Sequence, residues 1–163
     1  MKKITYPIIS IIILIFINAC AGYKPIYTTD LQFKIADYSI KSNKKLGRQI
    51  YSKLYGLSKS KKNKAKTQSV IIAIDIKKDK NATIKDSTGK ILEYRIILTS
   101  NIIIKDYLTN DEILNHNFSY SSTYKAQDLY SETIKLENIS IKNLINKTYQ
   151  NLLIQMSQIL QTK

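Results

Sequence analysis

The chain has 163 residues, and its 26 lysine and arginine residues against 12 aspartate and glutamate residues give a net charge of +14. One domain is expected from this length. With a single cysteine and a single histidine, the composition excludes a disulfide framework, a zinc site and a nucleophile–histidine pair.

The first twenty residues have the order of a secretory signal peptide. Lys2 and Lys3 precede an apolar block from Ile8 to Ile17, and small residues follow before Cys20. The block is shorter than the roughly 18 to 20 residues that span a bilayer. We therefore predict a signal peptide over residues 1–19 and not a transmembrane helix.

The segment Ile17-Asn18-Ala19-Cys20 resembles the bacterial lipoprotein box, aliphatic-small-small-Cys, from which Asn18 departs. The resemblance implies cleavage before Cys20 and acylation of both its thiol and its new amino group, palmitate being one such chain. Several acyl chains hold a protein on a membrane permanently. The alternative is an ordinary free or buried cysteine. The mature chain would keep 163 minus 19, or 144, residues.

The positive charge by itself does not determine which class of partner the protein binds. Basic proteins bind nucleic acid, anionic lipid or lipopolysaccharide. The charge also accompanies an abundance of isoleucine, asparagine and tyrosine, so a solvated surface without a dedicated ligand is an equal alternative. Export removes nucleic acid from normal reach, and we expect no nucleic-acid partner.

The mature chain begins with a tether and then alternates strand and helix. Gly22 and Pro25 indicate an extended lipidated tether over residues 20–30. Aromatic and β-branched residues predict a first strand from Leu31 to Ile40. A helix capped by Ser42 or Asn43 follows. Its apolar stripe consists of Leu46, Ile50, Leu54 and Leu57.

The next segment combines a basic run, a short strand and a polar stretch. We predict a solvated loop from Lys59 to Lys66 and a strand from Val70 to Ile76 with its even-numbered side chains on one face. A strand–helix–strand order predicts that the first two strands are parallel. Residues 77–90 are polar and are predicted to form a long turn.

The clearest predicted strands form a hairpin. Ile91 to Lys105 carries apolar side chains on one face and polar ones on the other, the chain turns from Asp106 to Asp111, and Ile113 to Tyr124 returns. The apolar face of the return strand carries Phe118, Tyr120 and Tyr124.

The end of the chain has helical spacing, with a start predicted between Ser131 and Ser140. Its apolar positions are Ile141, Leu144, Ile145, Leu152, Met156, Ile159 and Leu160. The predicted fold is a two-layer α/β sandwich over residues 31–163, with a four-stranded mixed sheet, two helices packed on one face and the order β-α-β-β-β-α.

We find no catalytic constellation, so no enzyme activity and no cofactor are expected. His116 is read as structural, and Asp111 and Glu112 as turn residues. No glycine-rich phosphate loop is present. A membrane-surface enzyme remains the alternative from another functional class.

Several features together resemble the lipopolysaccharide-assembly lipoprotein family LptE. They are the lipoprotein box, the Gly-aromatic-basic-Pro start over residues 22–27, the Gly89 to Glu93-Tyr94 approach to an apolar strand, the tyrosines from Tyr120 to Tyr124 and the closing helix. The resemblance implies a lipoprotein on the periplasmic face of the outer membrane that plugs the LptD β-barrel and helps to insert lipopolysaccharide.

Lipid A phosphates bind to lysine or arginine. The resemblance implies binding at the tip of the domain, where Lys85 and Lys90 are the first candidates and Lys135, near the last helix start, is the third. Solvated turn lysines are the alternative. Another envelope complex, for barrel assembly or transport, is the alternative destination of the lipoprotein.

Overall fold

The computed structural model describes residues 31–60 and 67–161, which form one four-stranded sheet and two helices. The elements are β1 (Phe33–Ser42), α2 (Lys44–Ser60), β2 (Gln68–Lys85), β3 (Ile91–Asp106), β4 (Glu112–Lys125) and α3 (Tyr130–Gln161). The predicted signal peptide, Cys20 and the tether lie outside the described residues.

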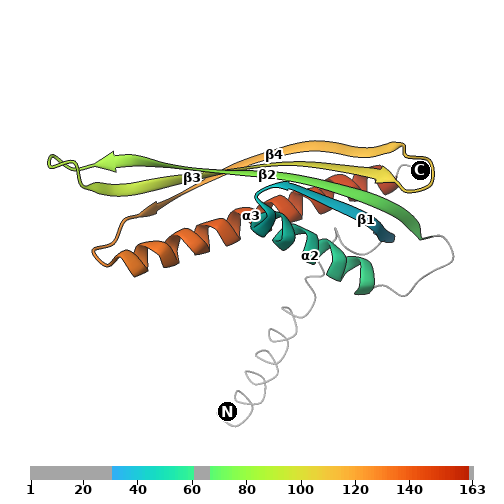
Figure 1. Ribbon diagram of the computed structural model, residues 1–163, viewed down its shortest axis with the longest axis horizontal. Helices are drawn as coiled ribbons and strands as arrows, with labels where there is room; N and C mark the ends of the chain where they lie inside the picture. The colour runs from blue at the N-terminus through green and yellow to red at the C-terminus, as the bar shows by residue number, and fades with distance from the viewer. Residues whose placement is uncertain (1–30, 61–66, 162–163) are drawn as a thin grey trace, which may run out of the picture.

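The sheet has the order β1-β2-β3-β4, with β1 parallel to β2 and the other neighbours antiparallel. Both helices cover one face of it, and α3 runs along most of its length (Figure 1). The predicted two-layer sandwich with its β-α-β-β-β-α order is confirmed.

The core lies between the sheet and the helices. Alternation along β2 and β3 directs one row of aliphatic side chains toward the helices, where they are almost completely buried. These residues are Val70, Ile72, Ile74, Ile76, Ile96, Leu98, Ile102 and Ile104. The predicted apolar face of the sheet is therefore the face that the helices cover.

Helix α2 begins as its sequence indicates. The side chain of Asn43 accepts a hydrogen bond from the backbone N–H of Leu46 at 3.1 Å, the N-cap arrangement that satisfies an otherwise unpaired donor. Leu46, Ile50 and Leu54 are buried against the sheet. The helix continues through Lys59 to Ser60, so the loop predicted from Lys59 is wrong for these two residues.

Strand β2 is much longer than predicted, and the long turn over residues 77–90 is wrong. Lys77 to Lys85 continue the strand and pair with β3 as far as Ile91. Polar alternation does not exclude a strand, because backbone hydrogen bonds to β3 hold it where neither face is fully buried. The chain reverses only between Asp86 and Lys90.

The predicted faces of β3 and β4 are confirmed by the strand register. Tyr94 pairs with Tyr124, Leu98 with Tyr120, and Ile102 with His116. The His116 ring lies 4.5 Å from that of Phe118, centroid to centroid.

Helix α3 starts at Tyr130, one residue before the predicted window. Ile141, Leu144, Ile145, Leu152 and Met156 form its buried stripe, as predicted.

Candidate functional site

The β2–β3 hairpin projects beyond α2 and β1 at one end of the molecule, the same end at which α3 begins (Figure 1). Asp86 organises the turn: one carboxylate oxygen accepts hydrogen bonds from the backbone N–H groups of Thr88 and Lys90, both at 2.9 Å. The hydrogen bonds from Thr88 are the main reason that the pKa of Asp86 is lowered. Gly89 adopts a φ of 88°, a conformation that favours glycine.

The structure brings two of the three predicted lysines together. Lys85 ends β2 and is paired in register with Ile91, which follows Lys90. Lys90 Nζ lies 3.1 Å from Asp128 Oδ1, but both side chains are largely exposed, so the pair contributes little. Lys135 is exposed on α3, beside a shallow hollow that also includes Ile139 and Lys142.

This end of the molecule also exposes large apolar side chains. They belong to the hairpin, to the loop after β4 and to the first turns of α3, and they are Ile84, Leu92, Leu129, Tyr130 and Ile139. Lysines beside exposed aliphatic and aromatic groups are the combination expected where a protein meets an amphiphile that carries phosphate.

A polar cluster fastens the start of α3 to the sheet. Glu137 accepts hydrogen bonds from Lys78 Nζ at 3.0 Å, Lys80 Nζ at 2.7 Å and the Tyr124 hydroxyl at 3.0 Å. Its side chain is only 11% exposed. The Lys80 ammonium also lies 4.3 Å from the ring centroid of Tyr94, so this cation has an aromatic as well as an anionic partner.

These contacts decide the protonation states. Burial by itself would raise the pKa of the Glu137 carboxyl, but the hydrogen bonds from Lys80, Lys78 and Tyr124 outweigh it and lower that pKa to about 2. For Lys80, burial acts in the opposite direction, yet the bonds to Glu137 and Tyr124 raise its pKa. Glu137 is thus a carboxylate at neutral pH, held by two ammonium groups in a structural arrangement.

A groove of about 660 Å³ runs between α2 and α3. Its apolar lining includes Leu46, Ile141 and Ile145. Its charged lining consists of Lys45, Arg48, Lys53, Lys78, Lys142 and Glu137. Because Glu137 is already paired, the free charge along the groove is positive.

The sheet face opposite the helices has no covering element among the described residues (Figure 1). On β4 its exposed side chains from Asn115 to Thr123 are short and uncharged, namely Asn115, Asn117, Ser119, Ser121 and Thr123, and Lys125 ends the same row. On β2, Asp75 lies in register between Lys41 and Asn101, and one of its carboxylate oxygens is buried without a hydrogen-bond partner in the structure. We call this surface the open sheet face.

Solved structures share this fold. The uncharacterized lipoprotein B of Nitrosomonas europaea, determined by NMR, has a TM-score of 0.62 at 17% identity, covering 86% of this chain and 93% of its own. A minor lipoprotein of Acinetobacter baumannii has a TM-score of 0.55 at 15% identity, covering 79% and 94%. No protein-family model and no curated protein sequence matches. The chain has the fold of these two lipoproteins.

Residues 31–60 and 67–161 contain no group of three or more side chains that could ligate a metal ion. None of their helices is long and apolar enough to cross a membrane.

Sequence reasoning missed the Glu137 cluster because it placed Lys78 and Lys80 in a turn. A signal was present: both lysines continue the even-numbered row that starts at Val70, so a longer strand directs them toward the helices. The glutamate partner could not be found in this way, since it comes from an element 57 residues further along the chain.

Proposed function

We propose that this protein is a lipoprotein anchored by acyl chains on Cys20 to the periplasmic face of the outer membrane, where it supports an LptD-type β-barrel in lipopolysaccharide assembly. The lipoprotein box and its place after an export signal support the anchor. The fold shared with two lipoproteins is compatible with it. In this proposal the protein is a binding module and not an enzyme.

The contact with the barrel is proposed from the side chains of the open sheet face. In a chain with 26 lysine and arginine residues, all five outward positions of β4 from Asn115 to Thr123 are short and uncharged. The cations of the open sheet face, Lys77, Arg95, Lys105 and Lys125, lie around this uncharged stretch of β4. Short asparagine, serine and threonine side chains suit close packing against the polar inner wall of a large barrel.

In this proposal lipopolysaccharide binds at the hairpin end, which is formed by the β2–β3 turn, the loop after β4 and the first turns of α3. Lys85, Lys90 and Lys135 supply cations for lipid A phosphates, and Ile84, Leu92 and Tyr130 supply apolar surface beside them. Among the described residues, only Lys90 of these three cations has an ion-pair partner, and that partner is exposed.

A tagged pull-down from detergent-solubilised outer membrane in high salt tests the barrel contact. A shape-matched partner stays bound at high salt, whereas a contact made by charge alone is screened away. Mass spectrometry should find a large LptD-type β-barrel in equal amount. Recovery of the lipoprotein alone, or with a barrel-assembly or transport complex, would overturn the proposal.

Binding of purified lipopolysaccharide tests the hairpin end separately. The variant K85Q/K90Q/K135Q should lose most binding, while K77Q/K105Q/K147Q, which removes three cations outside the proposed site, should keep it. Equal loss in both variants would show that net charge, and not the hairpin end, governs binding.

A further inference from the structure

The positive charge of this protein is concentrated in one part of the chain. No aspartate or glutamate occurs between Asp37 and Asp75. In this interval the described residues include six cations: Lys41, Lys44, Lys45, Arg48, Lys53 and Lys59. All six side chains are exposed.

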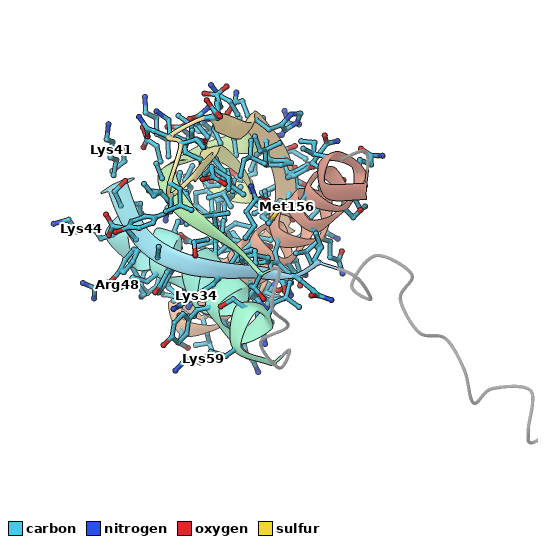
Figure 2. The ribbon with its side chains drawn as sticks, turned by 90° about the vertical axis from the view of Figure 1, so that its right-hand side faces the viewer. Lys34, Lys41, Lys44, Arg48, Lys59 and Met156 are labelled. Carbon is cyan, nitrogen blue, oxygen red and sulfur yellow. The ribbon has the colours of Figure 1, made fainter. Side chains whose placement is uncertain are left out.

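Most of these cations lie on the side of α2 that faces away from the sheet. Because Leu46, Ile50 and Leu54 are buried against the sheet, the helical repeat places Lys44, Arg48 and Lys59 on the opposite side, with Lys45 beside them. Figure 2 shows Lys41, Lys44 and Arg48 directed outward along one flank of the molecule. We call Lys44, Lys45, Arg48, Ser52, Tyr55 and Lys59 the α2 face.

Within the part of the chain that the structure describes, the cations of the α2 face have no carboxylate partner. The ion pairs found among residues 31–60 and 67–161 use Lys78, Lys80 and Lys90 only. Cations so closely spaced and without a carboxylate among the described residues repel one another, so their accumulation points to an external anion.

Tyrosines border this charge. The rings of Tyr38 and Tyr51 stack at 4.0 Å between centroids, and those of Tyr51 and Tyr55 at 5.7 Å. Tyr38 and Tyr55 are 46% and 39% exposed. Tyrosine, with an apolar ring and a polar tip, is favoured at membrane–water interfaces, as are lysine and arginine.

The chain also keeps α2 near the anchor. From Cys20 to Leu31 there are eleven residue steps, which reach at most about 40 Å when fully extended. Strand β1 and then α2 follow directly. An acylated Cys20 would therefore hold the α2 face within reach of the lipid headgroups.

We propose that the α2 face docks on an anionic phospholipid surface and, together with the acyl chains, fixes the orientation of the domain on its membrane. Lipid anchors and basic surfaces commonly act as such a pair. The inference rests on the Cys20 anchor of the proposed function but not on its β-barrel partner. The α2 face and the open sheet face lie on different sides of the molecule, so both contacts can form together (Figure 1).

The test labels the lipidated mature protein at one introduced cysteine with an environment-sensitive fluorophore. Ser52→Cys places the label on the α2 face, and Ser121→Cys places it on the open sheet face; both positions are exposed. The labelled proteins are reconstituted in phosphatidylcholine vesicles with or without phosphatidylglycerol. A nitroxide-labelled lipid headgroup reports which fluorophore touches the surface.

We expect quenching and a blue shift at position 52 only, only with phosphatidylglycerol, and less at high salt. The substitutions K44Q, R48Q and K59Q together should abolish this response, since each cation near an anionic surface strengthens binding roughly fivefold. The control K77Q/K105Q/K147Q removes the same charge elsewhere and should leave the response intact.

Three results would overturn the docking proposal. They are no response at position 52, an equal response at position 121, and a response at position 52 that requires a β-barrel or lipopolysaccharide in the vesicle. Failure of the anchor is recognised differently: Cys20 would then take up a second fluorophore. Flotation of that unanchored chain on phosphatidylglycerol vesicles at low salt, with and without K44Q/R48Q/K59Q, would still decide whether the α2 face binds.

Discussion

Glu137 joins α3 to β2 and β4 through Lys78, Lys80 and Tyr124. Strand β1 ends opposite Ile76, so α2 and β1 do not reinforce this part of the sheet. In this part of the sheet the polar cluster therefore stabilises the contact between α3 and the strands, as aliphatic packing does elsewhere. Breaking such an arrangement is costly because it leaves partly buried charge without a partner.

The substitution Glu137→Gln should lower the free energy of unfolding by about 2 kcal/mol at pH 7, less than a fully buried pair costs, because the two lysines can still reach water. Urea unfolding measures this. Asp79→Asn, which removes an exposed carboxylate from β2, is the control and should change the value by less than about 0.5 kcal/mol. Equal effects would contradict the structural role of Glu137.

The same carboxylate makes stability depend on pH. Its pKa in the folded protein, about 2, lies below the unfolded value of 4.5, so its stabilisation is complete above pH 4.5 and is lost as pH falls from 4.5 toward 2. Wild type should therefore lose more stability over that interval than Glu137→Gln. Parallel curves of unfolding free energy against pH would disprove this coupling.

Ser100 is a polar residue in the middle of the aliphatic core. It is 0% exposed, and its hydroxyl has no hydrogen-bond partner in the structure. Ser100→Ala should raise the free energy of unfolding by about 1 kcal/mol, because it removes an unsatisfied buried group. Ser121→Ala on the open sheet face serves as the control, with no measurable change expected in the melting temperature.

At the scale of elements, the two glycines of α2 have opposite effects on stability. A Cβ at Gly47 would collide with Cγ2 of Ile40, whereas one at Gly56 would meet nothing within 4 Å. Gly47 therefore allows α2 to approach β1 closely. Gly56 only weakens the helix, because glycine loses more backbone freedom than alanine on folding.

Substituting these glycines tests the packing of α2. Gly47→Ala should destabilise the protein by about 1 to 3 kcal/mol, and Gly56→Ala should stabilise it by about 0.5 to 1 kcal/mol. Thermal unfolding of both variants measures the difference. The same sign of change in both would mean that the β1–α2 contact is looser than described.

At the scale of the whole molecule, the proposed contacts occupy different surfaces. The helices shield one side of the sheet and leave the other side uncovered, so a protein partner and a membrane can be met at once (Figure 1). The hairpin end remains accessible to lipopolysaccharide in this arrangement.

A bulky residue on the open sheet face should separate partner binding from folding. Ser121→Trp is expected to leave the melting temperature within about 2 °C of wild type, because the position is exposed, but to abolish co-purification of the β-barrel. Gln150→Trp, an exposed position on α3, is the matched control and should retain the barrel. Retention by Ser121→Trp would place the contact on another surface.

The sequence by itself determined the class of the fold, because the apolar residues repeat with period two in β2, β3 and β4 and with helical spacing in α2 and α3. It also predicted the parallel pairing of β1 with β2, which follows from the intervening helix. The Asn43 cap and the buried stripe of α2 were readable in the same way, since both are local.

Only the tertiary structure decided the course of β2 after Ile76, the partners of Glu137 and the separation of the α2 face from the open sheet face. Each depends on elements distant in the chain: β3 supplies the ladder that extends β2, and α3 brings Glu137 to Lys78 and Lys80. Local composition cannot show this, because the free energy that holds a polar strand or a buried charge comes from the element packed against it.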